Sequence, residues 1–234
     1  MSAIGYDRSL AYLRASSTEA PPTVSPCPGP VLTISRETGS GGSDVARLVA
    51  EWMPAKSSLR CKKWPVFDKA LVRRALEEHG LATELESYVP EDKVRLFRSA
   101  FEEMLGLHPP ADDLVKATNE TVLCLARLGN VVIVGRGANM LTARMPNVLR
   151  VRIVAPLAGR ILRIRERFQL TEKEAAAFVL RNDKARERYV AGNFQVSISD
   201  PVRYDLVLNT GRLSAAACAG VICAALEQMP VLAG

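Results

Sequence analysis

Residues 31–52 combine residue types in an order that is suited to phosphate binding. An apolar, β-forming run from Val31 to Ile34 leads into a glycine-rich loop, and a helix-like run from Val45 to Trp52 follows at once. The glycines of this loop are Gly39, Gly41 and Gly42. Glycine lets the backbone wrap closely around an anion, and free N–H groups at the start of a helix point towards it. The segment therefore predicts a phosphate site, with an ordinary turn between a strand and a helix as the alternative.

The loop departs from a common phosphate-binding template at its charged position. The residues from Arg36 to Ser43 read R-E-T-G-S-G-G-S, whereas the template is G-x-x-x-x-G-K-[ST]. Gly41 and Ser43 match the template, but Arg36 stands at its first glycine and Gly42 at its lysine. We therefore expect a loop that cradles phosphate through its backbone but lacks the usual point charge.

A second motif places an arginine at the end of a predicted strand. Arg136 lies between Gly135 and Gly137, straight after the apolar β-branched run Val131–Val134. Such a run is typical of a buried parallel strand, and an arginine at its carboxyl end can hold a phosphate with a planar, bidentate fork. The alternative is a surface arginine in a turn.

Positive charge is concentrated further along the chain. Residues 150–188 hold eleven Lys or Arg against five Asp or Glu, an excess that indicates either a solvated helix face or a flap over a polyphosphate. A flap suits phosphoryl transfer, which needs positioning, exclusion of water and positive charge. Arg181 and Arg186 are five residues apart, so on one helix their directions differ by about 140° at roughly 100° per residue. We therefore expect the helix to end or bend near Asn182 and Asp183, so that both arginines converge.

The remaining pattern alternates between helices and strands. Helices are predicted at residues 69–79, 93–105, 112–128, 156–168 and 214–227, with one more that opens at a Thr171–Glu174 capping box, and strands at residues 131–134, 147–154 and 205–208. Alternation of this kind predicts an α/β fold with a parallel sheet that is covered on both faces. Ligands in such folds lie at the carboxyl ends of the strands, where the glycine loop and Arg136 both fall.

Length and composition set wider bounds. A chain of 234 residues fits one α/β domain, and the net charge of +6 favours anionic ligands such as nucleotides, or nucleic acid. The five cysteines are scattered, which is typical of reduced cysteines in a cytoplasmic protein, and no apolar run is long enough to span a membrane. Residues 1–29, with clustered Ser, Thr and Pro, predict a flexible leader before a folded domain at residues 30–230.

Five motifs in order resemble one family. They are I-S-R-E-T-G-S-G-G-S-D-V-A-R, V-F-D-K-A-L-V, V-I-V-G-R-G-A-N, R-N-D-K-A-R-E-R and Y-D-L-V-L-N-T-G-R-L-S. From about Val31 to Glu227 the chain is similar to the cytidylate kinase-like family of P-loop kinases. This resemblance implies a three-layer P-loop kinase fold with a parallel five-stranded sheet and a helical lid at about residues 156–195. It also implies transfer of the ATP γ-phosphate to CMP or dCMP, with Mg²⁺.

The resemblance further implies roles for single residues. The donor nucleotide is expected at the glycine loop and at the loop after the last strand: Gly39, Ser40, Gly41, Gly42, Ser43, Asn209 and Arg212. The catalytic residues expected are Arg36, Asp68, Arg136, Arg181 and Arg186. Within this set, Arg36 replaces the missing lysine charge, Arg136 contacts the acceptor phosphate, and Arg181 and Arg186 belong to the lid.

The metal would be held by Ser43 and Asp68, although Asp68 could instead cap a helix that begins at Lys69. At Asn139 the family often has Asp, so a carboxylate role is in question there. Three functions stay open: a kinase for CMP or dCMP, a P-loop kinase for another small phosphate acceptor, and a nucleotide-binding regulator with little turnover. Nucleotide substrates are the expected partners, a membrane or nucleic acid is not, and no motif indicates an oligomeric state.

Overall fold

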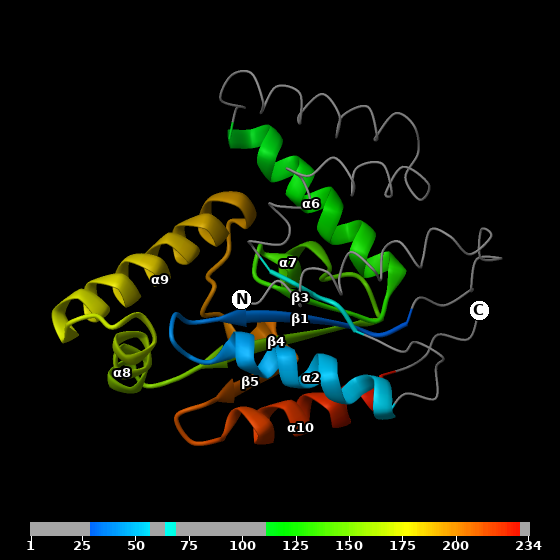
Figure 1. Cartoon of the computed structure of the whole chain (residues 1–234). Coiled ribbons are helices and arrows are strands. Elements are labelled where there is room, and N and C mark those ends of the chain that lie inside the picture. The colour runs from blue at the N-terminus through cyan, green and yellow to red at the C-terminus, as the bar shows by residue number, and fades with distance from the viewer. Residues whose placement is uncertain (1–28, 57–63, 69–110, 230–234) are drawn as a thin grey trace.

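The computed structural model describes residues 29–56, 64–68 and 111–229 and contains one parallel five-stranded sheet (Figure 1). The strands lie in the order β2-β3-β1-β4-β5. Their bounds are β1 Val31–Arg36, β2 Val66–Phe67, β3 Val131–Val134, β4 Val148–Val154 and β5 Leu206–Asn209. The described helices are α2 Gly42–Lys56, α6 Ala111–Leu128, α7 Ala138–Leu141, α8 Leu157–Phe168, α9 Glu172–Phe194, the 3₁₀ helix η1 Pro201–Arg203 and α10 Ala215–Glu227. The predicted α/β class with a parallel five-stranded sheet is confirmed.

Strand β1 lies at the centre of the sheet and positions the glycine loop. Its first residue, Val31, is in register with Val131 of β3 on one side and with Val148 of β4 on the other. The carboxyl ends of these three strands therefore meet at one edge. Strands β3 and β2 lie on one side of β1, and β4 and β5 lie on the other, which makes this edge the usual place for a ligand.

Alternating side chains of the strands build two cores on opposite faces of the sheet. Leu32 and Ile34 of β1 pack with Val151 and Ile153 of β4 beneath α2 and α10. Val31, Val131 and Ile133 pack on the other face, with Val122 and Leu125 of α6. Figure 1 shows the sheet between the α2–α10 layer and the α6–α7 layer. These are the three layers that the sequence predicts.

Helices α8 and α9 lie outside these layers, beyond the carboxyl edge of the sheet (Figure 1). They pack on each other through a small core of Ile164, Ala175 and Val179. The Thr171 side chain accepts a hydrogen bond from the Glu174 backbone N–H, and the Glu174 side chain reaches back to the Thr171 N–H. The predicted capping box is therefore confirmed.

The expected end of the lid helix near Asn182 and Asp183 is wrong. Helix α9 runs without interruption from Glu172 to Phe194. One stripe of this helix faces the sheet edge at helical spacing: Asn182, Ala185, Arg186, Tyr189 and Val190. Arg181 falls outside this stripe and is exposed, since a regular helix cannot turn residues five apart in the same direction.

Other boundaries differ from the predictions by a few residues. Helix α2 begins at Gly42, three residues before the predicted start, so the last glycine of the loop already belongs to the helix. Pro156 is the N-cap of α8 and not its first residue. The helices predicted at residues 69–79 and 93–105 and nearly all of the leader at residues 1–29 lie outside the described residues. None of the described helices combines the length and the apolar character that a membrane span requires.

Candidate nucleotide site

The glycine loop presents a row of backbone donors. Gly39 and Gly41 have φ angles of 77° and 78°, a left-handed conformation that glycine adopts without strain. Within the described part of the chain, the N–H groups of Gly39, Gly41, Gly42 and Ser43 donate no hydrogen bond. Four free donors at the start of α2 form the concave surface that an anion needs.

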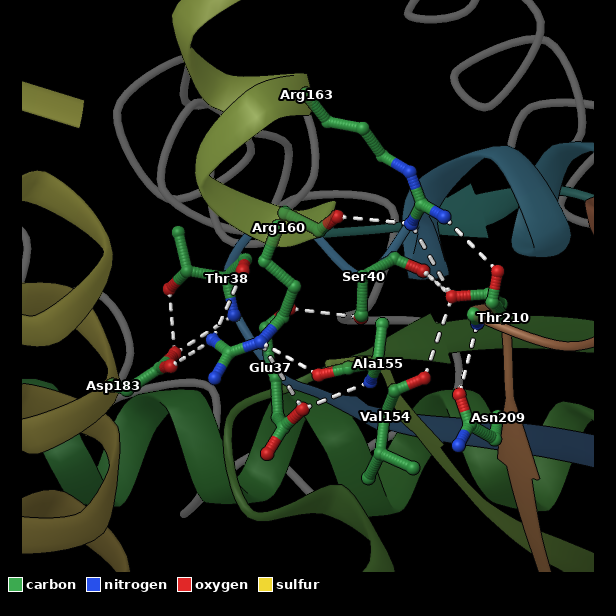
Figure 2. Close-up of polar contacts among 12 residues, drawn as sticks. Glu37, Thr38, Ser40, Val154, Ala155, Arg160, Arg163, Asp183, Asn209 and Thr210 are labelled. Atoms are coloured by element: carbon green, nitrogen blue, oxygen red, sulfur yellow. Dashed lines mark hydrogen bonds and ion pairs between the residues drawn. The ribbon is translucent and has the colours of Figure 1, made fainter. Parts of the chain in front are cut away.

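Contacts with the loop after β5 hold the glycine loop in this shape (Figure 2). The Ser40 hydroxyl donates to the Glu37 carbonyl oxygen at 2.9 Å, and the Thr210 hydroxyl donates to the Ser40 carbonyl oxygen at 2.7 Å. Arg163 of α8 joins the two loops, because it donates to the carbonyl oxygens of Gly39 at 3.1 Å and of Thr210 at 3.0 Å. The loop is thus built before any ligand binds.

Asp183 of α9 ties the helical unit to the same loop (Figure 2). Its Oδ1 accepts from the backbone N–H and the hydroxyl of Thr38, both at 2.7 Å. Its Oδ2 accepts from Arg160, which also donates to the carbonyl oxygen of Ala155 at 2.9 Å and lies 3.4 Å from the Glu37 carboxylate. Arg160 is buried but fully paired, so its charge stabilises the attachment of α8 and α9 to the loop.

Arg36 occupies the space that the two neighbouring glycines leave open. A Cβ atom at Gly42 would lie 2.8 Å from the Arg36 Cβ atom, and a Cβ atom at Gly135 would collide with the Arg36 guanidinium. Burial, and then the positive charge of Arg186, lower the pKa of Arg36 to about 10, against the opposite effect of Asp68. No hydrogen bond of the described residues involves the Arg36 guanidinium, so a charged group is held without a fixed partner.

A cavity of about 260 Å³ lies between the ends of β1 and β3 and helix α9, and we call it the β3-side cavity. Arg36, Arg136 and Arg186 line it, one from each of these three elements. Arg136 has a φ of 60°, which costs a residue with a Cβ atom about 1 kcal/mol. The fold therefore maintains an unfavourable backbone conformation where the arginine meets the cavity.

Two polar side chains of the β3-side cavity were not assigned a role by the sequence. The Tyr189 hydroxyl and the Asn139 amide nitrogen are buried and have no hydrogen-bond partner among the described residues. Burial raises the pKa of Tyr189, against the opposite effect of Arg136. Tyr189 could have been found from its helical spacing to Arg186. Thr38 and Thr210 lie within the quoted motifs, but nothing in those motifs indicates that they join the glycine loop to its neighbours.

The remaining predicted site residues differ in their exposure and in whether they line the β3-side cavity. Ser43 is exposed in the first turn of α2, and Asp68 is half-buried at the end of β2, where its charge acts on Arg36. Asn209 is the last residue of β5 and Arg212 follows that strand, and both are exposed at the β5 side of the sheet. Arg186 lines the cavity and donates to the Thr38 hydroxyl, whereas Arg181 does not line it. Whether Asp68 caps a helix depends on residues from Lys69 onward, which are not described.

Comparisons with known proteins bear on the family and the fold of the chain. The sequence profile of a family described as the cytidylate kinase-like family matches residues 31–212. A protein named cytidylate kinase from Pyrococcus horikoshii is 23% identical over 199 residues, which cover 85% of this chain and 89% of that protein. Its namesake from Thermococcus kodakarensis is 22% identical over the same shares. A crystal structure of an uncharacterized protein from Eubacterium ventriosum has a TM-score of 0.63 at 20% identity, covers 85% of this chain and 98% of its own, and shows a shared fold.

Proposed function

Because the chain belongs to the cytidylate kinase-like family, we propose that it transfers the terminal phosphate of ATP to a nucleoside monophosphate, with CMP or dCMP as the acceptor. One observation carries this proposal: a loop with four free N–H groups adjoins a cavity lined by three arginines. The loop suits a polyphosphate, and the arginines suit a second phosphate beside it. Phosphoryl transfer between two such groups depends mainly on positioning and on compensation of negative charge.

The donor phosphates would lie on the glycine loop. The N–H groups of Gly39, Gly41 and Gly42 would bind the phosphate oxygens, while the Ser40 hydroxyl keeps the loop in place through Glu37. Asn209 and Arg212 would border the adenine base, since the loop that carries them is joined to the glycine loop through Thr210.

The acceptor phosphate would lie in the β3-side cavity. Arg136 can offer a bidentate fork to its oxygens, and Arg36 stands between this cavity and the glycine loop. Arg36 and Arg186 would then compensate the charge that is shared by the donor and acceptor phosphates as the transfer proceeds. Tyr189 and Asn139 would contact the nucleoside, because each has an unsatisfied polar atom at the cavity.

The residues around the loop also fit Mg²⁺. The exposed hydroxyl of Ser43 and the carboxylate of Asp68 are the hard oxygen ligands that this ion prefers, and phosphate oxygens and water complete its usual shell. When bound, the ion would neutralise phosphate charge. Helices α8 and α9 would act as the lid, because polar contacts to the glycine loop connect them to the sheet.

A coupled assay with ATP, Mg²⁺ and a panel of nucleoside monophosphates tests the proposal. We expect turnover with CMP or dCMP, a loss of turnover in Arg136→Ala, and no rescue in Arg136→Lys, since lysine lacks the bidentate fork. Arg186→Ala should lower turnover far more than Arg181→Ala, because only Arg186 lines the cavity. Turnover that Arg136→Ala leaves intact would remove Arg136 from the site.

Two other functions would give different results in the same assay. A kinase for another small acceptor would turn over ATP only when non-nucleotide acceptors are added to the panel, and that turnover would still need Arg136. A nucleotide-binding regulator would bind ATP without turnover, and the glycine at the lysine position favours this alternative. ATP affinity measured by calorimetry, together with the turnover data, separates the three.

A further inference from the structure

A second cavity lies beside the first, on the β4 side of the sheet edge. It measures about 340 Å³, and we call it the β4-side cavity. Arg36, Arg186 and Ile198 line both cavities, so the two adjoin along these residues. Helix α9 covers the β4-side cavity with a stripe of its own: Leu180, Asp183, Lys184 and Glu187.

Arg152 of β4 lines this cavity and differs from the other buried arginine of the described chain. Only 7% of Arg152 is exposed. Its Nη1 donates to the Ser35 hydroxyl at 3.0 Å, and its guanidinium lies 5.6 Å from the centre of the Tyr204 ring. Among the described residues no carboxylate forms an ion pair with it, whereas the buried Arg160 has two, Glu37 and Asp183.

Two of the three carboxylates that line the β4-side cavity already have ion-pair partners. Glu37 accepts a hydrogen bond from the Ala155 backbone and pairs with Arg160, and Asp183 pairs with Arg160 and Arg186. The third, Glu187, is exposed on α9. Positive charge therefore prevails where Arg152 meets the cavity. A buried charge without a counter-ion costs several kcal/mol, and an anionic ligand removes that cost.

We propose that the β4-side cavity is a second oxyanion site, in which Arg152 and Arg186 bind a phosphate group. The planar guanidinium of Arg152 uses only one of its nitrogens on Ser35, so its remaining donors can form a bidentate contact. Burial lowers the pKa of Arg186, against the pull of Asp183, and the neighbouring charges of Arg152 and Arg160 lower it further. A bound phosphate would relieve this repulsion. The site does not depend on the proposed transfer reaction.

Titration of the full chain with inorganic phosphate tests the site directly. The guanidinium N–H signal of Arg152 is followed by ¹⁵N NMR and is identified by its loss in Arg152→Lys. We expect a saturable shift of this signal with phosphate and none with chloride at equal ionic strength. A signal that does not respond to phosphate overturns the proposal, and this measurement on the unaltered protein needs no variant that could misfold.

Variants separate the two cavities. Arg152→Gln should weaken phosphate binding at least about tenfold at this site, as loss of a charged hydrogen bond does. Arg165→Gln, which removes an exposed charge from α8, should leave the binding unchanged. In Arg136→Gln the Arg152 signal should still shift with phosphate. If the shift disappears in Arg136→Gln, or if Arg152→Gln binds phosphate normally, the second site does not exist.

A third arm identifies the source of the phosphate group. The titration is repeated after saturation with ATP or with CMP. A phosphate response of Arg152 that persists shows a site for free phosphate beside the nucleotide. A shift that the nucleotide alone produces, and that added phosphate no longer changes, shows that a phosphate of the nucleotide occupies the site. Both results support a phosphate site on Arg152, and the absence of any response to all three ligands contradicts it.

Discussion

Gly42 has no side chain because Arg36 fills the space that one would need. A Cβ atom there would lie 2.8 Å from Arg36 Cβ, which is closer than atoms in contact come, and 3.1 Å from Arg36 Cγ, which is tighter than most contacts. The arginine side chain then extends from Gly42 to Gly135, which lacks a side chain for the same reason. Positions 36 and 42 are in contact in space. We therefore interpret the arginine at position 36 as a replacement for the positive charge that a lysine at position 42 would supply.

This interpretation predicts how two substitutions combine. Arg36→Ala should weaken ATP binding by about 1–3 kcal/mol, because a charged contact is lost. Gly42→Lys alone should lower stability by about 1–3 kcal/mol, since it crowds Arg36. The double variant Arg36→Gly/Gly42→Lys also removes the Arg36 Cβ atom and should bind ATP more tightly than Arg36→Ala does. Calorimetry measures the affinities and thermal unfolding the stability.

Gly220→Lys serves as the control for an added lysine, since nothing lies within 4 Å of a Cβ atom there and the position is in α10, away from the loop. It should not restore ATP affinity to Arg36→Ala. If the double variant binds ATP no better than Arg36→Ala, a lysine at position 42 does not replace the charge of Arg36.

Helices α8 and α9 are held against the glycine loop by polar contacts, and Asp183 takes part in several of them. It accepts hydrogen bonds from Thr38, Arg160 and Arg186, and removal of its charge would leave the buried Arg160 with Glu37 as its only ion-pair partner. Loss of one partner of a buried pair costs more than the pair contributes. Asp183 is therefore one of the groups on which the stability of this attachment depends.

Asp183→Asn should lower the free energy of unfolding by about 2–3 kcal/mol, as measured by denaturant titration. Its side chain is only 26% exposed, so solvent screens the loss incompletely. The control is Glu51→Gln, which breaks the exposed i,i+4 pair with Arg47 and should cost less than about 0.5 kcal/mol. If the two substitutions lower the free energy of unfolding equally, Asp183 contributes no more to stability than an exposed ion pair does.

Glycines in the helices and in the loop should respond to alanine in opposite directions. Gly192 of α9 has nothing within 4 Å of its Cβ position, so Gly192→Ala should raise stability by about 0.5–1 kcal/mol through helix propensity. Gly39 has a left-handed φ, and its Cβ would lie 2.6 Å from the Arg160 carbonyl oxygen, so Gly39→Ala should lower stability by more than about 1 kcal/mol. Thermal unfolding of the two variants measures this, and a stabilising Gly39→Ala would contradict the loop geometry.

At the scale of the whole molecule, the described residues form three apolar cores that differ in size and in how they are connected. Two large cores cover the faces of the sheet, while the α8–α9 unit has only Ile164, Ala175 and Val179 with a few half-buried neighbours. A small core joined to the rest by polar contacts opens at lower free energy than a sheet buried on both sides. The architecture therefore allows the unit over the site to move while the sheet stays folded.

Hydrogen exchange measured by mass spectrometry checks this division. Without ligand, amides of α9 should exchange faster than those of β1 and β3 by about tenfold or more. With ATP and a nucleoside monophosphate, exchange in α8, α9 and the glycine loop should slow, while exchange in α10 should stay unchanged. Uniform protection of α9 and the sheet without ligand would show one cooperative unit instead.

Much of the fold follows from short-range signals in the sequence. The β-branched run Val131–Val134 is a strand within those bounds, and the Thr171–Glu174 capping box begins α9 where it was expected. The glycine loop could be located because it needs only neighbouring residues, two glycines with left-handed φ and a helix start. Such features depend on backbone conformation and on spacing, which a sequence states directly.

The tertiary structure alone decided which distant side chains meet. Arg36 lies between Gly42 and Gly135, and Asp183 reaches Thr38 across 145 positions. Arg152 is buried with no ion-pair partner in the part of the chain that the structure describes. The sequence also suggested a break in α9, because two arginines five residues apart cannot face one phosphate on a regular helix. The helix instead continues and turns only Arg186 inward. Helical period determines the direction of each side chain on its own element, but only the packing of the elements determines what that side chain meets.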